Sequence, residues 1–114
     1  MYEYKATLVR VVDGDTAYVD VDLGFDIKIT IDFRLLGINA PEMKGATKVA
    51  GLAAKDHLTQ LLGQGTLSLK SEKPLKTDKY GRWLATFTVT RPDGTSFDAN
   101  AQMVADGFAI PFMV

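Results

Sequence analysis

Two runs of alternating residues constrain the fold of this chain more than any other feature of its sequence. Residues 16–23 place an apolar side chain at every second position, and residues 27–36 do the same after a turn at Gly24. Alternation with a period of two is typical of strands that bury one face, so both runs predict strands of a meander. The pattern puts Arg34 on the polar face. The expected core-facing residues are Ala17, Val19, Val21, Leu23, Ile27, Ile29, Ile31, Phe33 and Leu35.

The remaining segments complete the pattern of a small barrel. A β-branched run precedes the meander, and Asp13-Gly14 is a typical hairpin turn because glycine tolerates a positive φ. Helical spacing and possible caps predict two helices. The predicted segments are strands at 5–12, 66–70, 82–90 and Ser96-Phe97, and helices at 48–62 and from Asp98 to Asp106. This order predicts a mainly β fold, a five-stranded OB-fold Greek-key barrel with one crossing helix and a short C-terminal helix.

Composition limits the organisation and the chemistry. The 114 residues fit a single domain spanning residues 1–114, which we expect to be monomeric with no protein partner. The absence of cysteine excludes thiolate chemistry, and the single His57 excludes a multi-histidine metal site within one chain. No apolar run has the length of a membrane span, and the first residues do not resemble a signal peptide. We therefore expect no membrane association and a cytoplasmic chain, or a secreted one if a leader was removed.

Charge is distributed unevenly along the chain, although the net charge is only −1. Residues 13–42 contain seven acidic and two basic side chains, and residues 70–82 contain five basic and two acidic ones. The acidic segment suits a divalent cation and the basic segment suits phosphate. The simpler alternative is that both segments are solvated faces.

Oxygen-bearing side chains follow two of the predicted strands. Asp13 and Asp15 flank the first tight turn, while Asn39, Ala40 and Glu42 follow the second alternating run at a corner bent by a proline. Such a corner can offer an amide oxygen, a backbone carbonyl and a carboxylate to one point, and calcium accepts this mixture of ligands. An isolated Asp-Gly-Asp, by contrast, is most often a simple hairpin turn.

Two arginines complete the candidate chemistry. Arg34 lies in the second alternating run, and Arg82 directly precedes the apolar strand at 83–90. A guanidinium binds two oxygens at once and keeps its charge at neutral pH, which suits a phosphodiester. Carboxylates and arginines together are what metal-assisted phosphodiester cleavage requires. The alternatives are that Arg34 is an exposed strand residue paired with Asp32 or another acid, and that Arg82 is a loop cation.

Four motifs occur in a fixed order along most of the chain. They are Val12-Asp13-Gly14-Asp15-Thr16, Phe33-Arg34-Leu35-Leu36, Ala40-Pro41-Glu42 and Thr77-Asp78-Lys79-Tyr80-Gly81-Arg82. Together they resemble the staphylococcal nuclease (thermonuclease) family. The resemblance implies a calcium-dependent OB-fold nuclease that hydrolyses DNA and/or RNA, expels the 5′ oxygen and leaves 3′-phosphate products.

The resemblance also implies three groups of functional residues: metal ligands with their supporting neighbours, catalytic residues, and contacts to a second substrate phosphate. The metal ligands would be Asp15, Asn39 and Ala40, supported by Asp13 and Thr16. The catalytic residues would be Arg34, Glu42 and Arg82, and the contacts to the second phosphate would be Lys79 and Tyr80. Asp15 would bind calcium through its carboxylate and Ala40 through its backbone carbonyl. Glu42 would position or deprotonate the attacking water, and the arginines would stabilise the transition state.

One substitution separates this chain from the family pattern. Asn39 stands where the family has a second aspartate ligand, so a negative charge is lost and calcium affinity should fall. The family's base-packing aromatic pair is not reproduced near residue 114 either. An alternative function is therefore an OB module that binds nucleic acid without cutting it. A purely structural OB subunit has no support beyond the fold, and the joint presence of the carboxylates and arginines favours the enzyme.

Overall fold

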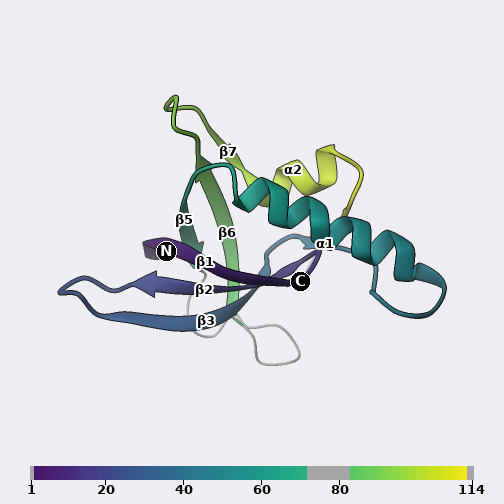
Figure 1. The fold of residues 1–114 in the computed structure, drawn as a ribbon, viewed down its shortest axis with the longest axis horizontal. Coiled ribbons are helices and arrows are strands. Elements are labelled where there is room, and N and C mark those ends of the chain that lie inside the picture. Colours follow the sequence, from purple (N-terminus) through teal and green to yellow (C-terminus); the bar gives the residue numbers. More distant parts are fainter. Residues whose placement is uncertain (1, 72–82, 113–114) are drawn as a thin grey trace.

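The first three strands form the meander that the alternating runs predict (Figure 1). The computed structural model describes residues 2–71 and 83–112. β1 (Tyr2–Asp13) pairs with β2 (Thr16–Asp22), and β2 pairs with β3 (Lys28–Leu35), both antiparallel. The core-facing residues of β2 are buried, namely Ala17, Val19 and Val21.

Two later strands close the meander into a barrel. β5 (Thr66–Ser71) pairs antiparallel with β1, and β6 (Trp83–Thr90) pairs antiparallel with β5. β6 also runs parallel to β3, with Phe33 opposite Trp83, and this pairing closes the barrel. The predicted five-stranded OB-type barrel is therefore confirmed.

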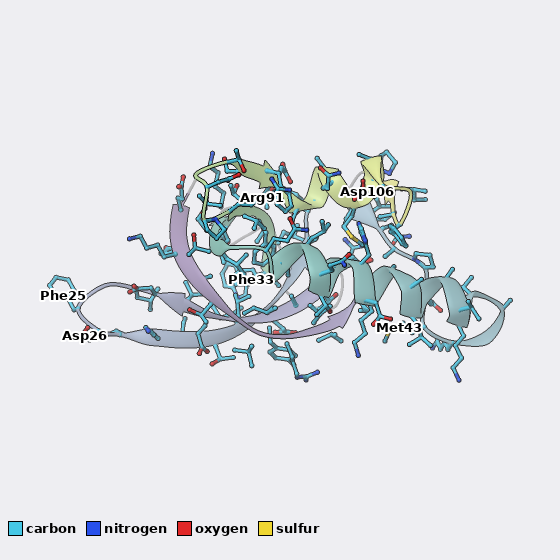
Figure 2. All side chains as sticks on the ribbon, turned by 45° about the horizontal axis from the view of Figure 1, so that its top comes forward. Phe25, Asp26, Phe33, Met43, Arg91 and Asp106 are labelled. Atoms are coloured by element: carbon cyan, nitrogen blue, oxygen red, sulfur yellow. The ribbon has the colours of Figure 1, made fainter. Side chains whose placement is uncertain are left out.

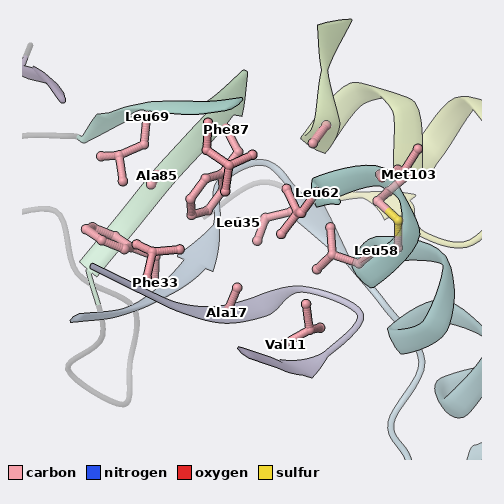
Figure 3. Packing of buried hydrophobic residues seen from close by; sticks show 14 of the residues in the cluster. Val11, Ala17, Phe33, Leu35, Leu58, Leu62, Leu69, Ala85, Phe87 and Met103 are labelled. Atoms are coloured by element: carbon pink, nitrogen blue, oxygen red, sulfur yellow. The ribbon is translucent and has the colours of Figure 1, made fainter. Parts of the chain in front are cut away.

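The crossing helix α1 (Lys48–Leu62) has the bounds that the sequence predicts. Along the chain it lies between the barrel strands β3 and β5. Its buried apolar face joins the barrel core (Figure 3), because leucines spaced along one side of a helix point the same way. The buried apolar residues of this helix are Ala54, Leu58, Leu61 and Leu62.

The C-terminal helix α2 (Ala99–Ala105) has the predicted caps. The Asp98 side chain accepts the Ala101 N–H at 3.0 Å, which confirms it as the N-cap. Gly107 has a φ of +83° and its N–H donates to the Val104 carbonyl at 3.0 Å, while the next N–H donates to Met103 at 2.9 Å. This is a Schellman ending. In residues 2–71 and 83–112, neither helix has the length and apolar character needed to cross a membrane.

The remaining elements are short, namely β4 (Ile38–Asn39), η1 (Gly45–Thr47), β7 (Ser96–Asp98) and β8 (Ile110–Pro111). β4 and β8 form a separate two-stranded antiparallel sheet with Asn39 opposite Ile110. The Phe112 N–H then donates to the Gly37 carbonyl at 2.8 Å. This pairing, which the sequence does not predict, lays the β8 segment against the corner that follows β3.

A buried asparagine fastens the parallel seam between β3 and β6. Asn100 is 4% exposed, and its amide nitrogen donates to the carbonyls of Leu36 at 2.9 Å and Ala85 at 3.0 Å. Its oxygen accepts the Phe87 N–H at 3.1 Å. One side chain of α2 therefore satisfies three backbone groups at the strand pairing that closes the barrel.

The core fills the barrel and the space between the strands and both helices (Figure 3). Phe87 is fully buried and meets Phe33 edge-on, with ring centroids 6.1 Å apart and an interplanar angle of 84°. Leu58 and Leu62 from α1 and Met103 from α2 join the same cluster. The helices thus share one core with the barrel and hold its strands in place.

The β2–β3 hairpin corrects one part of the predicted core. Leu23, Ile27 and Ile29 were expected to face it but are 42%, 54% and 43% exposed. The pairing of β2 with β1 ends at Val21, while the pairing of β2 with β3 continues to Asp22 and Lys28. The end of this hairpin is therefore a two-stranded ribbon that projects beyond the core (Figure 2). Its tip is Phe25, 98% exposed and at a φ of +54°.

Candidate active site at the β1–β2 turn and the β3–β4 corner

Asp15 is the fixed point of the candidate site. It is 8% exposed and lies in the turn between β1 and β2. Its Oδ2 accepts the Ala40 N–H at 2.9 Å, and its Oδ1 accepts the Thr16 hydroxyl at 3.2 Å. The Asp15 N–H donates to the Asp13 Oδ1 at 3.1 Å. The carboxylate is therefore oriented by contacts to two segments that are 25 residues apart in sequence.

Gly14 is required at this turn for a different reason from the predicted one. Its φ is not in the positive range, so tolerance of a left-handed conformation does not explain it. A Cβ built on Gly14 would lie 2.6 Å from the Ala40 Cβ and 2.7 Å from the Ala54 Cβ. The glycine instead allows the turn, the β4 corner and α1 to meet in close contact.

Arg34 is buried, which rules out the alternative of an exposed strand arginine. It lies on the predicted face of β3 but is only 8% exposed, in contact with the corner that follows β3, with Asp15 and with the ring of Phe112. Its Nη1 donates to the carbonyls of Leu35 at 3.2 Å and Ile38 at 3.0 Å. Its Nη2 lies 3.6 Å from the Asp15 Oδ2. The acid that it pairs with is therefore Asp15, from the preceding motif, and not Asp32.

The corner residues expected to bind metal lie beside this pair. The Asn39 Oδ1 accepts the Arg34 Nη2 at 3.0 Å, and the Ala40 N–H binds Asp15 as described above. Three segments predicted separately, the first turn, β3 and the corner, are thus brought into one buried cluster. Phe112, whose ring lies 5.4 Å from the Arg34 guanidinium carbon, joins it. No sequence signal pointed to Phe112, because it reaches the site only through the short β8 pairing.

Negative charge is concentrated at the turn. Burial, together with the hydrogen bond and the charge of Asp15, raises the pKa of Asp13 to about 6. Two neighbouring carboxylates with little water around them favour a bound cation. Among the described residues no three His, Asp or Glu side chains converge, so a cation here would need amide, carbonyl or water oxygens as well. Hard-oxygen donors of this kind suit calcium.

Glu42 lies beyond the corner and is exposed. Its backbone carbonyl accepts the Thr47 hydroxyl at 2.8 Å, so the residue is anchored through its main chain while its carboxylate is free to meet solvent. The other predicted site residues, Lys79, Tyr80 and Arg82, lie outside the described residues. The strand that follows them, β6, begins beside β3 at the Trp83–Phe33 pairing.

The OB-type barrel buries an arginine against a carboxylate at a strand corner, and the family comparison makes the chain a nuclease-like module. A profile of the staphylococcal nuclease homologue family matches residues 32–113, and the chain belongs to this family. The chain is also similar to Protein ParB of Escherichia coli, with 34% identity over 118 residues, covering 94% of this chain and 56% of ParB. It therefore spans little more than half the length of that relative.

Proposed function

We propose that this chain is a calcium-dependent phosphodiesterase that hydrolyses DNA and/or RNA and leaves 3′-phosphate products. The observation that carries the proposal is the Asp15–Arg34 pair, a carboxylate and a guanidinium 3.6 Å apart and both 8% exposed. A purely structural ion pair of this kind is a weak contributor to stability because desolvation opposes it. In a site that binds a cation and a phosphate side by side, the carboxylate would bind the cation and the guanidinium would bind the phosphate.

Each residue of the site has a role in the proposed reaction. Bound calcium would be held by Asp15, Asn39 and the Ala40 carbonyl, and it would polarise the phosphate. Glu42 accepts a proton from a water as that water's oxygen forms a bond to phosphorus. The bond from phosphorus to the 5′ oxygen breaks, the departing 5′ oxygen takes a proton from solvent water to become a hydroxyl, and the 3′-phosphate remains on the other fragment.

Arg34 stabilises the charge that grows on the phosphate oxygens. Its guanidinium is already fixed by two backbone carbonyls and Asn39, so little reorganisation is needed during the reaction. By motif position Arg82 would act from the other side, with Lys79 and Tyr80 on a second phosphate. Asp13 and Thr16 would support the metal ligands, since both contact Asp15.

The second candidate is a nuclease-like module that binds nucleic acid without cutting it. The observation that favours it is Asn39, whose amide oxygen faces Arg34 and supplies no charge to a cation. The two candidates differ in whether Glu42 matters, because binding without cleavage does not require a general base.

A cleavage assay with calcium separates the two candidates. We expect the wild-type chain to cut plasmid DNA or RNA in millimolar calcium and to stop when a chelator is added. Glu42→Gln should lower kcat by about 10²–10⁴-fold, the usual contribution of a positioned acid or base. End-group analysis of the fragments should show 3′-phosphates. A folded wild-type chain that binds but does not cut, or a Glu42→Gln variant that cuts equally well, would favour the binding module.

Asn39→Asp tests the metal ligands. Restoring a carboxylate should raise calcium affinity by about tenfold, because the added negative charge attracts the cation. The gain is limited because the neighbouring Arg34 neutralises part of that added charge. Calorimetric calcium titration measures the change. Gln60→Glu is the matched control, because it makes the same change of amide to carboxylate at an exposed position of α1. Equal titrations for wild type and Asn39→Asp would remove Asn39 from the metal shell.

A further inference from the structure

A glycine inside α1 lies against the backbone of Glu42. Gly51 is buried in the first turn of the helix, where glycine destabilises a helix by about 1 kcal/mol relative to alanine. Its φ is not positive, so conformational freedom does not explain it. A Cβ there would lie 2.4 Å from the Glu42 carbonyl oxygen, 2.6 Å from its carbonyl carbon and 2.8 Å from the Met43 Cα. These separations are shorter than nonbonded atoms allow.

The same peptide is held from a second direction. The Thr47 hydroxyl donates to the Glu42 carbonyl at 2.8 Å and lies 3.2 Å from the Lys44 carbonyl. Thr47 directly precedes α1, so both contacts to Glu42 come from the beginning of this helix. The main chain of Glu42 is thereby fixed although its side chain is exposed.

The same face of α1 also touches the metal side of the site. Ala54, one turn after Gly51, is the residue that approaches Gly14 beside Asp15. Residues three apart on a helix share a face, so one rigid surface contacts both the Glu42 peptide and the Asp13–Asp15 turn. The helix therefore sets the distance between the base and the carboxylate of the cluster.

We propose that Gly51 is a positioning residue for Glu42, and that Thr47 assists it. The missing side chain seats α1 directly on the Glu42–Met43 peptide and fixes where the carboxylate can reach. This role rests on the proposed nuclease function and adds to it a requirement located in the helix, outside the reacting groups.

The test is a double-mutant cycle. Gly51→Ala forces the Glu42 peptide to move, and a displacement of about 1 Å at a reacting group can lower the rate by about 10²-fold. We expect kcat to fall by about 10–100-fold with little change in KM or calcium affinity. In a Glu42→Gln background, Gly51→Ala should cause no further loss, because the group it positions is already absent. An equal loss in both backgrounds, or no loss in either, overturns the proposal.

Two further variants separate positioning from folding. Gly63→Ala makes the same change at the far end of α1, where a Cβ would meet only Thr59 and Gln60 backbone oxygens at 3.2 and 3.7 Å, and kcat should not change. If Gly51→Ala does not fold, variants of Thr47 test the proposal instead. Thr47→Val, which removes the hydroxyl that binds the Glu42 carbonyl, should lower kcat, and Thr47→Ser, which keeps a hydroxyl, should have a kcat close to that of the wild type. Equal kcat for these two overturns the proposal. A wild-type chain without calcium-dependent cleavage instead overturns the proposed function, and this role with it, before any variant is compared.

Discussion

Arg34→Lys is expected to lower the cleavage rate by about 10²–10³-fold, the usual loss when one preorganised donor to a transition-state charge is removed. Lysine keeps the positive charge beside Asp15 but cannot bond the Leu35 and Ile38 carbonyls and Asn39 with one planar group. Because the charge is kept, the buried carboxylate is not left unpaired and the fold should survive. Single-turnover cleavage at saturating calcium measures the loss.

Arg91→Lys is the matched control for this variant. Arg91 is also fixed, by Gln64 at 3.0 Å and by the Phe97 ring at 4.4 Å, but it lies at the β6–β7 turn (Figure 2). Its replacement should leave the cleavage rate unchanged. If Arg34→Lys cleaves at the wild-type rate, the guanidinium has no part in the transition state and Asp15–Arg34 is a structural pair.

Asn100→Ala should lower the free energy of unfolding by about 3–5 kcal/mol, since each buried polar group left without its partner costs about 1–3 kcal/mol. The variant would remove the Asn100 partner of the Leu36 carbonyl and of the Phe87 N–H at once, while the Ala85 carbonyl would keep the Leu36 N–H at 2.9 Å. A loss of this size is a large part of the stability of a small domain. Urea unfolding followed by circular dichroism gives the value.

Gln102→Ala serves as the comparison for this loss. Gln102 is on the same helix and is half-buried, and its described side-chain bond is to Asp106 at 2.8 Å. Surface changes of this kind usually shift stability by no more than about 0.5 kcal/mol. Should the two variants unfold at the same urea concentration, the seam between β3 and β6 does not depend on Asn100.

Local patterns predicted the elements well because their causes are local. The helix at Lys48–Leu62 follows from apolar spacing and a terminal glycine, and the Asp98 cap follows from one side chain and the N–H three residues later. The barrel topology was confirmed because the predicted strands and helices follow one another in the order of an OB fold. Alternation does not show where a strand extends beyond the core. The prediction that Ile27 and Ile29 face the core was therefore wrong.

The site was predicted in composition more than in arrangement. Asp15, Arg34, Asn39 and Ala40 lie together, yet Arg34 also meets the ring of Phe112, which lies more than 70 positions later in the sequence. Gly14 was predicted to be needed for a positive φ, which it does not adopt. It is needed because the turn, the corner and α1 approach closely there, and a local sequence pattern does not show contacts between distant segments. The catalytic and metal-binding roles of these residues, together with those of Lys79, Tyr80 and Arg82, stay predictions.

The pairing of β4 with β8 also has a consequence for how the protein is made. Asn39 cannot adopt its place opposite Ile110 until the chain has been synthesised at least as far as Ile110. Contacts between such distant positions close slowly during folding. A growing chain that stops before Ile110 would therefore have the strands of the meander but not the paired β4–β8 corner beside Asp15 and Arg34.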